Sequence, residues 1–286
     1  MKTALVTGVG GQLGRALLAT RPDGWNCVPL NRAALDLSDP GGIARIVDFH
    51  QPYLVLNAAA YTAVDRAEAE PELAHAINAE APAAFARALA GSAGRLVQVS
   101  TDFVFDGQSG ESYRPEDPRN PQSVYGASKA AGEDAAGSDA IIVRTSWVHA
   151  AGGSNFVSTM LRLMRERAEL RVVADQIGSP TWATGLAQTL WCLAEKDQPG
   201  IYHHRDAGVA SWYDFAEAIA EEAFAIGLIA RIPAIIPIAT ADYPTPALRP
   251  SFSVLDVSTT RALLGDCHVH WRANLKSMLQ EEKDLG

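Results

Sequence analysis

The chain of 286 residues is 48% apolar and 20% charged, which is ordinary for a globular protein. Its 24 basic and 33 acidic residues give a formal net charge of −9, which opposes binding to nucleic acid or to an anionic membrane surface. No uninterrupted apolar run approaches the roughly 20 residues that span a bilayer. The cysteines, Cys27, Cys192 and Cys267, are widely separated, so we expect neither a disulfide framework nor a zinc site, and a reducing, cytoplasmic location.

The chain begins with a strand, a glycine turn and a helix. Residues 3–7 predict a short buried strand, and the apolar run at 15–19 predicts a helix. The spacing of Gly8, Gly11 and Gly14 lets the backbone turn tightly, brings N–H groups against a pyrophosphate and packs the helix close to the strand. This pattern predicts a dinucleotide-binding turn, and a tight turn without a ligand is the alternative.

Strands and helices then alternate along the first half of the chain. Short apolar runs predict strands, and longer periodic segments between them predict helices. Such repetition predicts an α/β fold with a Rossmann-like doubly wound parallel sheet, whose ligands bind outside the carboxyl ends of the strands. The predicted strands are 27–30, 53–57, 96–100 and 141–144, and the predicted helices are 42–49, 72–90 and 123–136.

The pattern loosens after residue 144. Further helices are predicted at 155–167, 182–195 and 212–224, and strands at 170–174 and 200–203, while the prolines of 231–250 exclude a regular helix. We predict a dinucleotide-binding domain from residues 1–148 together with about 171–208. Residues of about 149–170 together with 209–286 would form a second, smaller α/β substrate-binding lobe.

A tyrosine and a lysine lie four residues apart in the predicted helix 123–136. This spacing stacks Tyr125 and Lys129 on one helix face. A phenol beside a fixed ammonium is easier to ionise than one in water, so the pair can pass a proton to a sugar or alcohol oxygen. The pair alone is common by chance, and the glycine turn upstream is what favours a catalytic role.

These motifs, with others in the same order, resemble the dTDP-4-dehydrorhamnose reductases, a family of extended short-chain dehydrogenases/reductases. The resemblance runs nearly end to end. The motifs that carry it are Thr7-Gly-Val-Gly-Gly-Gln-Leu-Gly14, Asn57-Ala-Ala-Ala-Tyr-Thr-Ala-Val-Asp65, Ser100-Thr-Asp-Phe-Val-Phe-Asp-Gly107, Tyr125-x-x-x-Lys129, Arg144-Thr-Ser-Trp-Val148, Asp175-Gln-Ile-Gly-Ser-Pro-Thr181 and Tyr243-Pro-Thr-Pro-Ala247 with Arg249-Pro250.

The resemblance implies an oxidoreductase that reduces the C4 ketone of dTDP-4-dehydro-L-rhamnose to dTDP-L-rhamnose with a nicotinamide cofactor. Tyr125 would supply the proton, Thr101 would hydrogen-bond the ketone, and Lys129 would hold the cofactor ribose and lower the pKa of Tyr125. Two fixed donors aimed at O4 would stabilise the alkoxide charge that develops there. For Thr101 alone, a hydroxyl that caps a loop is the alternative.

Cofactor choice depends on the end of the second strand, where an acid would bind ribose hydroxyls and a basic residue would accept a 2′-phosphate. Arg32 stands there, which favours NADPH, with NADH as the alternative; a solvated loop arginine is the other reading. The resemblance places Asp36 and Leu37 on the adenine side. The full set of expected cofactor-binding residues is Gly8, Gly10, Gly11, Gln12, Leu13, Gly14, Asn31, Arg32, Asp36, Leu37, Ala58, Ala59, Ala60, Tyr61, Thr62, Tyr125 and Lys129.

The expected substrate-binding residues are Thr101, Asp102, Trp147 and Arg249. Asp102 would bind a sugar hydroxyl, and a solvated loop acid is the alternative. Trp147 would pack on the sugar or the base, or belong to the core. Arg249 would bind the diphosphate, because a planar fork suits that group and the prolines beside it fix the loop; a salt bridge to a nearby acid is the alternative.

Other functions remain open at this point. A related nucleotide-sugar 4-ketoreductase or a 4-epimerase would share the cofactor motif and the Tyr-Lys pair, and a regulatory subunit would bind the nucleotide without turning over a sugar. We expect no metal, because no carboxylate or histidine cluster has ligand spacing. The expected partner is the dTDP-sugar, with neither nucleic acid nor membrane, and a homodimer is compatible with the sequence.

Overall fold

The computed structural model describes residues 1–265 and 269–285, so Cys267 lies outside the described residues. The central strands are β1 (Lys2–Thr7), β2 (Trp25–Leu30), β3 (Leu54–Asn57), β4 (Arg95–Thr101), β5 (Ile141–Thr145) and β10 (Gly200–His203). They form a parallel sheet in the order β10-β5-β4-β3-β1-β2. The order reverses between β1 and β3, which is where sheets of this kind bind ligands.

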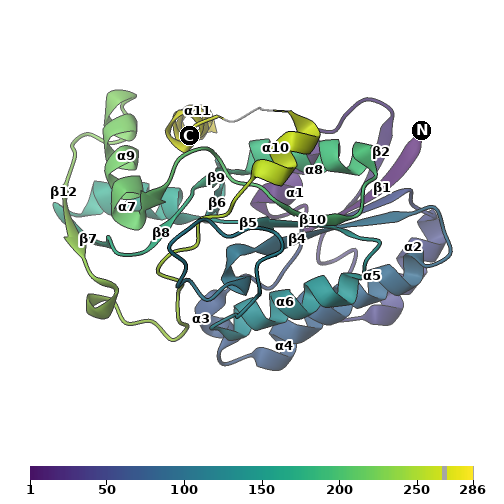
Figure 1. Cartoon of the computed structure of the whole chain (residues 1–286). Helices are drawn as coiled ribbons and strands as arrows, with labels where there is room; N and C mark the ends of the chain where they lie inside the picture. Colours follow the sequence, from purple (N-terminus) through teal and green to yellow (C-terminus); the bar gives the residue numbers. More distant parts are fainter. Residues whose placement is uncertain (266–268, 286) are drawn as a thin grey trace.

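Helices cover both faces of this sheet (Figure 1). One face packs against α1 (Gln12–Ala19) and α8 (Ala183–Lys196), and the other against α2 (Pro40–His50), α5 (Ala81–Leu89) and α6 (Val124–Ala136). The strands are buried on both faces, which explains their near-continuous apolar sequences. The predicted doubly wound α/β fold is confirmed.

The helix predicted at 72–90 is continuous but changes its winding. It comprises α4 (Pro71–His75), a π-helical turn η1 (Ala76–Glu80) and α5. Pro82 has no N–H to donate to the Asn78 carbonyl four residues earlier, so the helix widens at this turn. The widened turn lies against α6, where Gly132 leaves room for the Asn78 carbonyl.

A second apolar core lies beside the sheet (Figure 1). Its elements are α7 (Phe156–Glu166), β7 (Glu169–Val173), α9 (Trp212–Ala225), β12 (Ala234–Ile238) and α11 (Trp271–Leu285). The sequence assigned residues from about 171 to the first domain, but β7 pairs with β12. Leu170 and Val172 point into the second core and Arg171 points to solvent, so β7 packs with the second core, and the division of the chain into domains stays a prediction.

Short elements connect the two parts. Two strand pairs join them: β6 (Val148–His149) with β9 (Thr181–Trp182), and β8 (Ile177–Gly178) with β11 (Ala210–Ser211). The remaining helices are α3 (Val64–Ala67), α10 (Ser258–Leu264) and the 3₁₀ turns η2 (Asp102–Val104) and η3 (Thr240–Asp242). The proline-rich stretch contains β12 and η3 but no α-helix, as predicted. None of the described helices is long and apolar enough to cross a bilayer.

Candidate active site

The structure brings Tyr125, Lys129 and Thr101 together. Ser123 caps α6, because its hydroxyl accepts from the Gly126 N–H at 3.1 Å, and the helix then presents Tyr125 and Lys129 one turn apart. Thr101 ends β4 and is 5% exposed. A Cβ on Gly126 would lie 2.3 Å from the Phe103 carbonyl oxygen, so this glycine allows α6 to approach the strand end. The end of β4 and the start of α6 therefore contribute to one site.

The phenol of Tyr125 is buried, with 9% of the residue exposed, and its ring packs edge-on against Phe103 at 5.5 Å. Burial raises the pKa of Tyr125 to about 12, against a hydrogen bond with the Thr101 hydroxyl that lowers it. The sequence led us to expect a phenol that ionises more easily. The structure contradicts this expectation, because desolvation exceeds the effect of the neighbouring groups, and the phenol is held neutral.

Lys129 is buried beside this phenol. Its Nζ donates to the Val99 carbonyl oxygen of β4 at 2.6 Å. Burial lowers the pKa of Lys129 to about 8, while the charge of Glu133 acts to raise it. The ammonium is therefore predominantly charged at neutral pH, and its fixed position beside the sheet edge suits a contact with a ligand ribose.

Asp102 follows Thr101 and is 2% exposed, so it is not the solvated loop acid that the sequence left open. The Thr101 hydroxyl donates to Asp102 Oδ1 at 3.0 Å. Burial raises the pKa of Asp102 to about 6, against hydrogen bonds from the hydroxyls of Ser253 and Thr101 that lower it. A carboxylate held in this way is an acceptor for a sugar hydroxyl.

The glycine turn fits a pyrophosphate. Gly8 has a φ of 69°, and a Cβ there would lie 2.9 Å from the Ala59 N–H nitrogen. Gly14 lets α1 pack closely onto the turn, because a Cβ at this position would lie 2.2 Å from the Gly8 carbonyl oxygen. Gly10 faces open space, and the N-cap Gly11 makes no side-chain cap to the first-turn N–H groups of α1. A pyrophosphate needs a backbone that it can approach closely, space beside it and N–H groups that can donate, and this turn offers all three.

The turn after β3 completes this edge. Ala58, Ala59 and Ala60 are half-buried beside the glycine turn, and Thr62 is exposed. A row of side chains fixes the strand ends: Thr7 donates to Asn57 at 2.7 Å, and Asn57 donates to Gln98 at 2.7 Å.

The two expected cofactor-binding residues at the start of α1 differ in their surroundings. Leu13 is buried, whereas Gln12 Oε1 accepts from the Ala150 N–H and from the Asn155 side chain.

The adenine-side residues lie in the loop after β2. Asn31 and Arg32 are exposed, and the Asn31 side chain accepts from the N–H groups of the next turn. Asp36 accepts from Ser38, which keeps its pKa below the usual range, and the Arg32 charge adds to this effect. Leu37 is buried. The Arg32 fork is therefore accessible to a phosphate, and its contact with a 2′-phosphate stays a prediction.

Trp147 is half-buried and strained. Its φ of 47° lies in the left-handed region, which is unusual for a bulky side chain. The indole stacks on Trp212 at 3.5 Å with an interplanar angle of 9°. Gly178 leaves room for this ring, since a Cβ there would lie 2.7 Å from it. The stack joins the end of β5 to the second lobe, and a contact with the sugar or base stays a prediction.

Arg249 is engaged in the salt bridge that the sequence left as the alternative. Its two terminal nitrogens donate to the two carboxylate oxygens of Asp65 at 2.9 and 2.7 Å, and one also donates to Thr245 at 2.6 Å. The side chains of Arg249 and Asp65 are 25% and 41% exposed. To bind a diphosphate, the Arg249 guanidinium must therefore either leave the Asp65 carboxylate or contact both groups at once.

Asn78 is a site residue that sequence reasoning missed. It accepts from the Tyr61 N–H at 2.8 Å and donates to the Tyr61 carbonyl and to Ser128, whose hydroxyl donates to the Tyr125 carbonyl. The Tyr61 hydroxyl meanwhile donates to Glu70 at 2.6 Å. Asn78 thus ties the turn after β3 to the catalytic helix. A polar residue within an apolar helical pattern was the available signal.

A parallel doubly wound sheet with this turn and this Tyr-Lys pair at its carboxyl edge defines an extended short-chain dehydrogenase/reductase. The family model described as RmlD substrate binding domain matches residues 1–283. A dTDP-4-dehydrorhamnose reductase of Burkholderia thailandensis is 43% identical over 282 residues, which is 94% of this chain and 95% of that protein. The chain belongs to the dTDP-4-dehydrorhamnose reductase family.

Solved structures agree with this assignment. The dTDP-4-dehydrorhamnose reductase of Clostridium acetobutylicum superposes with a TM-score of 0.93 at 34% identity, over 98% of this chain and 99% of that chain. The enzyme of the same name from Bacillus anthracis, solved in complex with NADP, superposes with a TM-score of 0.91 at 34% identity and the same coverage. Within the described residues, no three His, Cys, Asp or Glu side chains are grouped to hold a metal ion.

Proposed function

We propose that this protein reduces the C4 ketone of dTDP-4-dehydro-L-rhamnose to dTDP-L-rhamnose with NADPH. The single observation that carries the proposal is the convergence of Thr101, Tyr125 and Lys129 at the sheet edge, next to the glycine turn. The relatives' names supply the substrate and the cofactor. NADPH would lie with its pyrophosphate on residues 8–14, and Arg32 would meet its 2′-phosphate.

The protein's own residues act on the ketone oxygen. Bound NADPH supplies the hydride. Tyr125 is protonated at neutral pH, because its pKa is about 12, so it is an acid ready to donate as charge develops on O4. Lys129, one turn of α6 from Tyr125 and charged at neutral pH, would stabilise the phenolate that remains after the transfer.

Substrate binding requires an exchange at Thr101. A hydroxyl has one proton, and Thr101 donates its proton to Asp102. To donate to the ketone, Thr101 must turn from the carboxylate, which then needs a new donor. A sugar hydroxyl would supply one, so the substrate would satisfy both groups at once, whereas a molecule without that hydroxyl would leave the buried Asp102 Oδ1 without its Thr101 donor.

Two rival functions have less support. A regulatory subunit that binds the nucleotide has no need of a phenol, a hydroxyl and an ammonium buried together at the end of β4 and the start of α6. A different nucleotide-sugar ketoreductase or an epimerase would use the same three residues, so the product decides between them. A cytoplasmic location and a homodimer stay predictions.

The test follows NADPH consumption by absorbance with dTDP-4-dehydro-L-rhamnose and identifies the product sugar by NMR. We expect stoichiometric oxidation of NADPH and dTDP-L-rhamnose as the product. Formation of the C4 epimer would assign the chain to another deoxysugar. Tight NADPH binding without turnover of any dTDP-4-keto sugar would favour the regulatory function.

A further inference from the structure

A buried ion pair lies behind the catalytic residues and takes no part in the chemistry described above. Glu133 of α6 and Arg144 of β5 are each 1% exposed at their side chains, and Arg144 Nη2 lies 2.7 Å from Glu133 Oε2. Arg144 Nε donates to Glu133 Oε1 at 2.8 Å. Such a pair is costly to desolvate and does not by itself indicate stability, so its position in the molecule needs another explanation.

The pair joins the catalytic helix α6 to β5, which lies next to β4, the strand that ends in Thr101. Strand register aligns Ser100, Arg144 and His203 across β4, β5 and β10. Glu133 lies over this row, and the Ser100 hydroxyl donates to its Oε1 at 2.6 Å. Ser100 immediately precedes Thr101, while Glu133 follows Lys129 by one turn of α6. The contact therefore fixes the helix that carries the acid against the strand end that carries the second donor.

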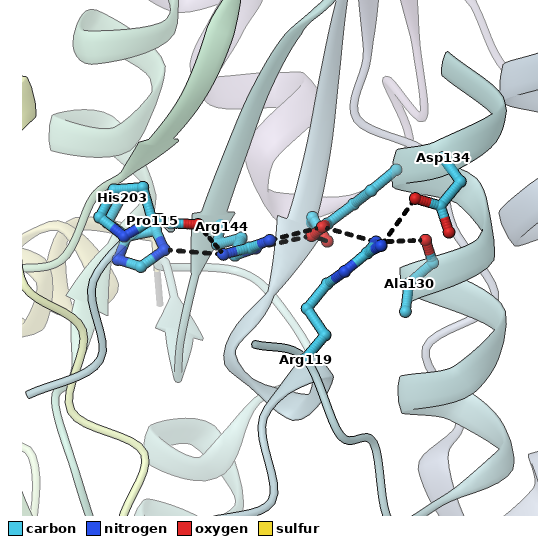
Figure 2. Close-up of polar contacts among 8 residues, drawn as sticks. Pro115, Arg119, Ala130, Asp134, Arg144 and His203 are labelled. Carbon is cyan, nitrogen blue, oxygen red and sulfur yellow. Dashed lines mark hydrogen bonds and ion pairs between the residues drawn. The ribbon is translucent and has the colours of Figure 1, made fainter. Parts of the chain in front are cut away.

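Arg144 lies between His203 and Pro115 on one side and the Glu133 carboxylate on the other (Figure 2). Its Nη1 donates to the Pro115 carbonyl at 3.0 Å and to His203 Nε2 at 3.3 Å, so His203 accepts at this nitrogen and its Nδ1 donates to the Asp256 carbonyl. Burial and the charge of Arg144 lower the pKa of His203 to about 3, which keeps the imidazole neutral. The Phe105 ring lies 5.0 Å from the guanidinium carbon.

The donors to Glu133 also determine what Lys129 can do. Four donor groups occupy its two oxygens, from Ser100, from Arg144 twice, and from Arg119 Nη1 at 3.2 Å. Lys129 lies one turn away on the same helix, where a Glu-Lys ion pair ordinarily forms. In the part of the chain that the structure describes, Lys129 donates to the Val99 carbonyl and is not an ion-pair partner of Glu133.

We propose that Glu133 and Arg144 are positioning residues: Arg144 holds the Glu133 carboxylate against the strand ends, so that α6 is fixed over Thr101 and the Lys129 ammonium is kept out of an ion pair with Glu133 and can meet the cofactor ribose. The inference rests on the proposed function in taking Lys129 as the group that meets the cofactor. Glu133 acts on Lys129 through space as well, because its charge favours the ammonium form.

Other charged groups around this site do not replace Glu133. Within the described residues, Glu133 is the charge that acts on the pKa of Lys129, and Asp102 is the charge that acts on that of Tyr125. The remaining titratable neighbours of the Glu133 carboxylate are Arg119 before α6, Asp134 on α6, Arg144 on β5 and His203 on β10. Asp134 bonds Arg119 on the solvent side and is 70% exposed, which makes it a matched control.

The test compares two variants that break the same pair from opposite sides. Glu133→Gln removes the negative charge that raises the Lys129 pKa, so this pKa should fall. Arg144→Met releases Glu133 to pair with Lys129, so the Lys129 pKa should rise and NADPH binding should weaken by about tenfold as Nζ is drawn away. Asp134→Asn should change neither. A purely structural role would move both variants in the same direction.

The main readout needs neither substrate nor turnover. Lys129 is one of five lysines, so its ¹³Cε resonance in the ligand-free protein can be assigned by its loss in Lys129→Met and followed against pH. NADPH affinity is measured by fluorescence titration. Opposite shifts of the Lys129 titration in the two variants support the inference, and shifts in one direction or none overturn it.

Loss of either charge alone can unfold the chain, because it leaves a buried charge unpaired. The double variant Glu133→Gln with Arg144→Met removes both charges and keeps the volume. Lys129 should titrate lower in it than in the parent, since the charge that raises its pKa is gone, and an unchanged titration overturns the inference. A parent protein that reduces no sugar but shows these shifts would refute the proposed function while leaving the positioning role intact.

Discussion

Replacing Tyr125 by Phe removes the phenol that we assign as the acid and leaves its ring in place. The ring keeps its edge-on contact with Phe103 and its position among apolar neighbours of α3 and η1. Thr101 is not orphaned, because it still donates to Asp102 at 3.0 Å and accepts from the Phe103 N–H at 3.2 Å. Folding should therefore lose about 1 kcal/mol, the net contribution of one hydrogen bond.

The effect on the reaction should be much larger. A positioned general acid typically contributes about 10²–10⁴ in rate, which is about 3–5 kcal/mol of transition-state stabilisation. We expect kcat to fall by this factor, with the Kd for NADPH little changed because no expected cofactor contact depends on the phenol proton alone. The difference between these two magnitudes separates a catalytic role of Tyr125 from a structural one.

Stopped-flow or steady-state absorbance of NADPH measures kcat, fluorescence titration measures the Kd, and thermal unfolding measures stability. Tyr202→Phe is a matched control, since it also removes the hydroxyl of a buried tyrosine. Tyr202 lies on β10, and its hydroxyl donates to the Gln198 carbonyl at 3.1 Å. A kcat for Tyr125→Phe within a few-fold of the parent would refute the assignment. So would equal losses in the variant and in the control.

Three further changes test the remaining assignments. Arg32→Ala should weaken NADPH binding more than NADH binding, by about 1–2 kcal/mol for a charge-assisted contact, and equal losses in a fluorescence titration would remove Arg32 from the 2′-phosphate site. Arg249→Ala should raise KM for the dTDP-sugar by about tenfold or more without changing NADPH affinity. Asp65→Asn frees the Arg249 guanidinium and should lower that KM by at most about fivefold. If steady-state kinetics show neither change, the diphosphate binds elsewhere. Gly132→Ala should destabilise the protein by about 1–3 kcal/mol, because its Cβ would lie 2.0 Å from the Asn78 carbonyl oxygen, and an unchanged melting temperature would contradict this close packing.

Short-range patterns were sufficient for the architecture of the first domain. Strand sequences buried on both faces have continuous apolar runs, and helices have their own period, so the order of elements could be predicted before any contact was known. The glycine turn and the Tyr125–Lys129 spacing were equally accessible, because each depends on neighbours within one turn of backbone. The division between the lobes was less accessible: nothing local in residues 169–173 indicates that this strand pairs with β12, more than 60 residues later.

The sequence alone predicted which residues would carry the chemistry, and only the tertiary structure shows their burial and their partners. Arg249 finds its partner at Asp65, 184 positions away, so no local pattern could show that its fork is occupied. The pKa of Tyr125 rises because folding removes water from around the phenol, and desolvation has no signature in the spacing of two residues. The sequence analysis did not single out Glu133 and named Arg144 only as the first residue of a motif, because their pairing depends on the packing of α6 on β4 and β5. Local backbone preferences depend on neighbouring residues, whereas burial and charge pairing arise only when segments distant in sequence pack together.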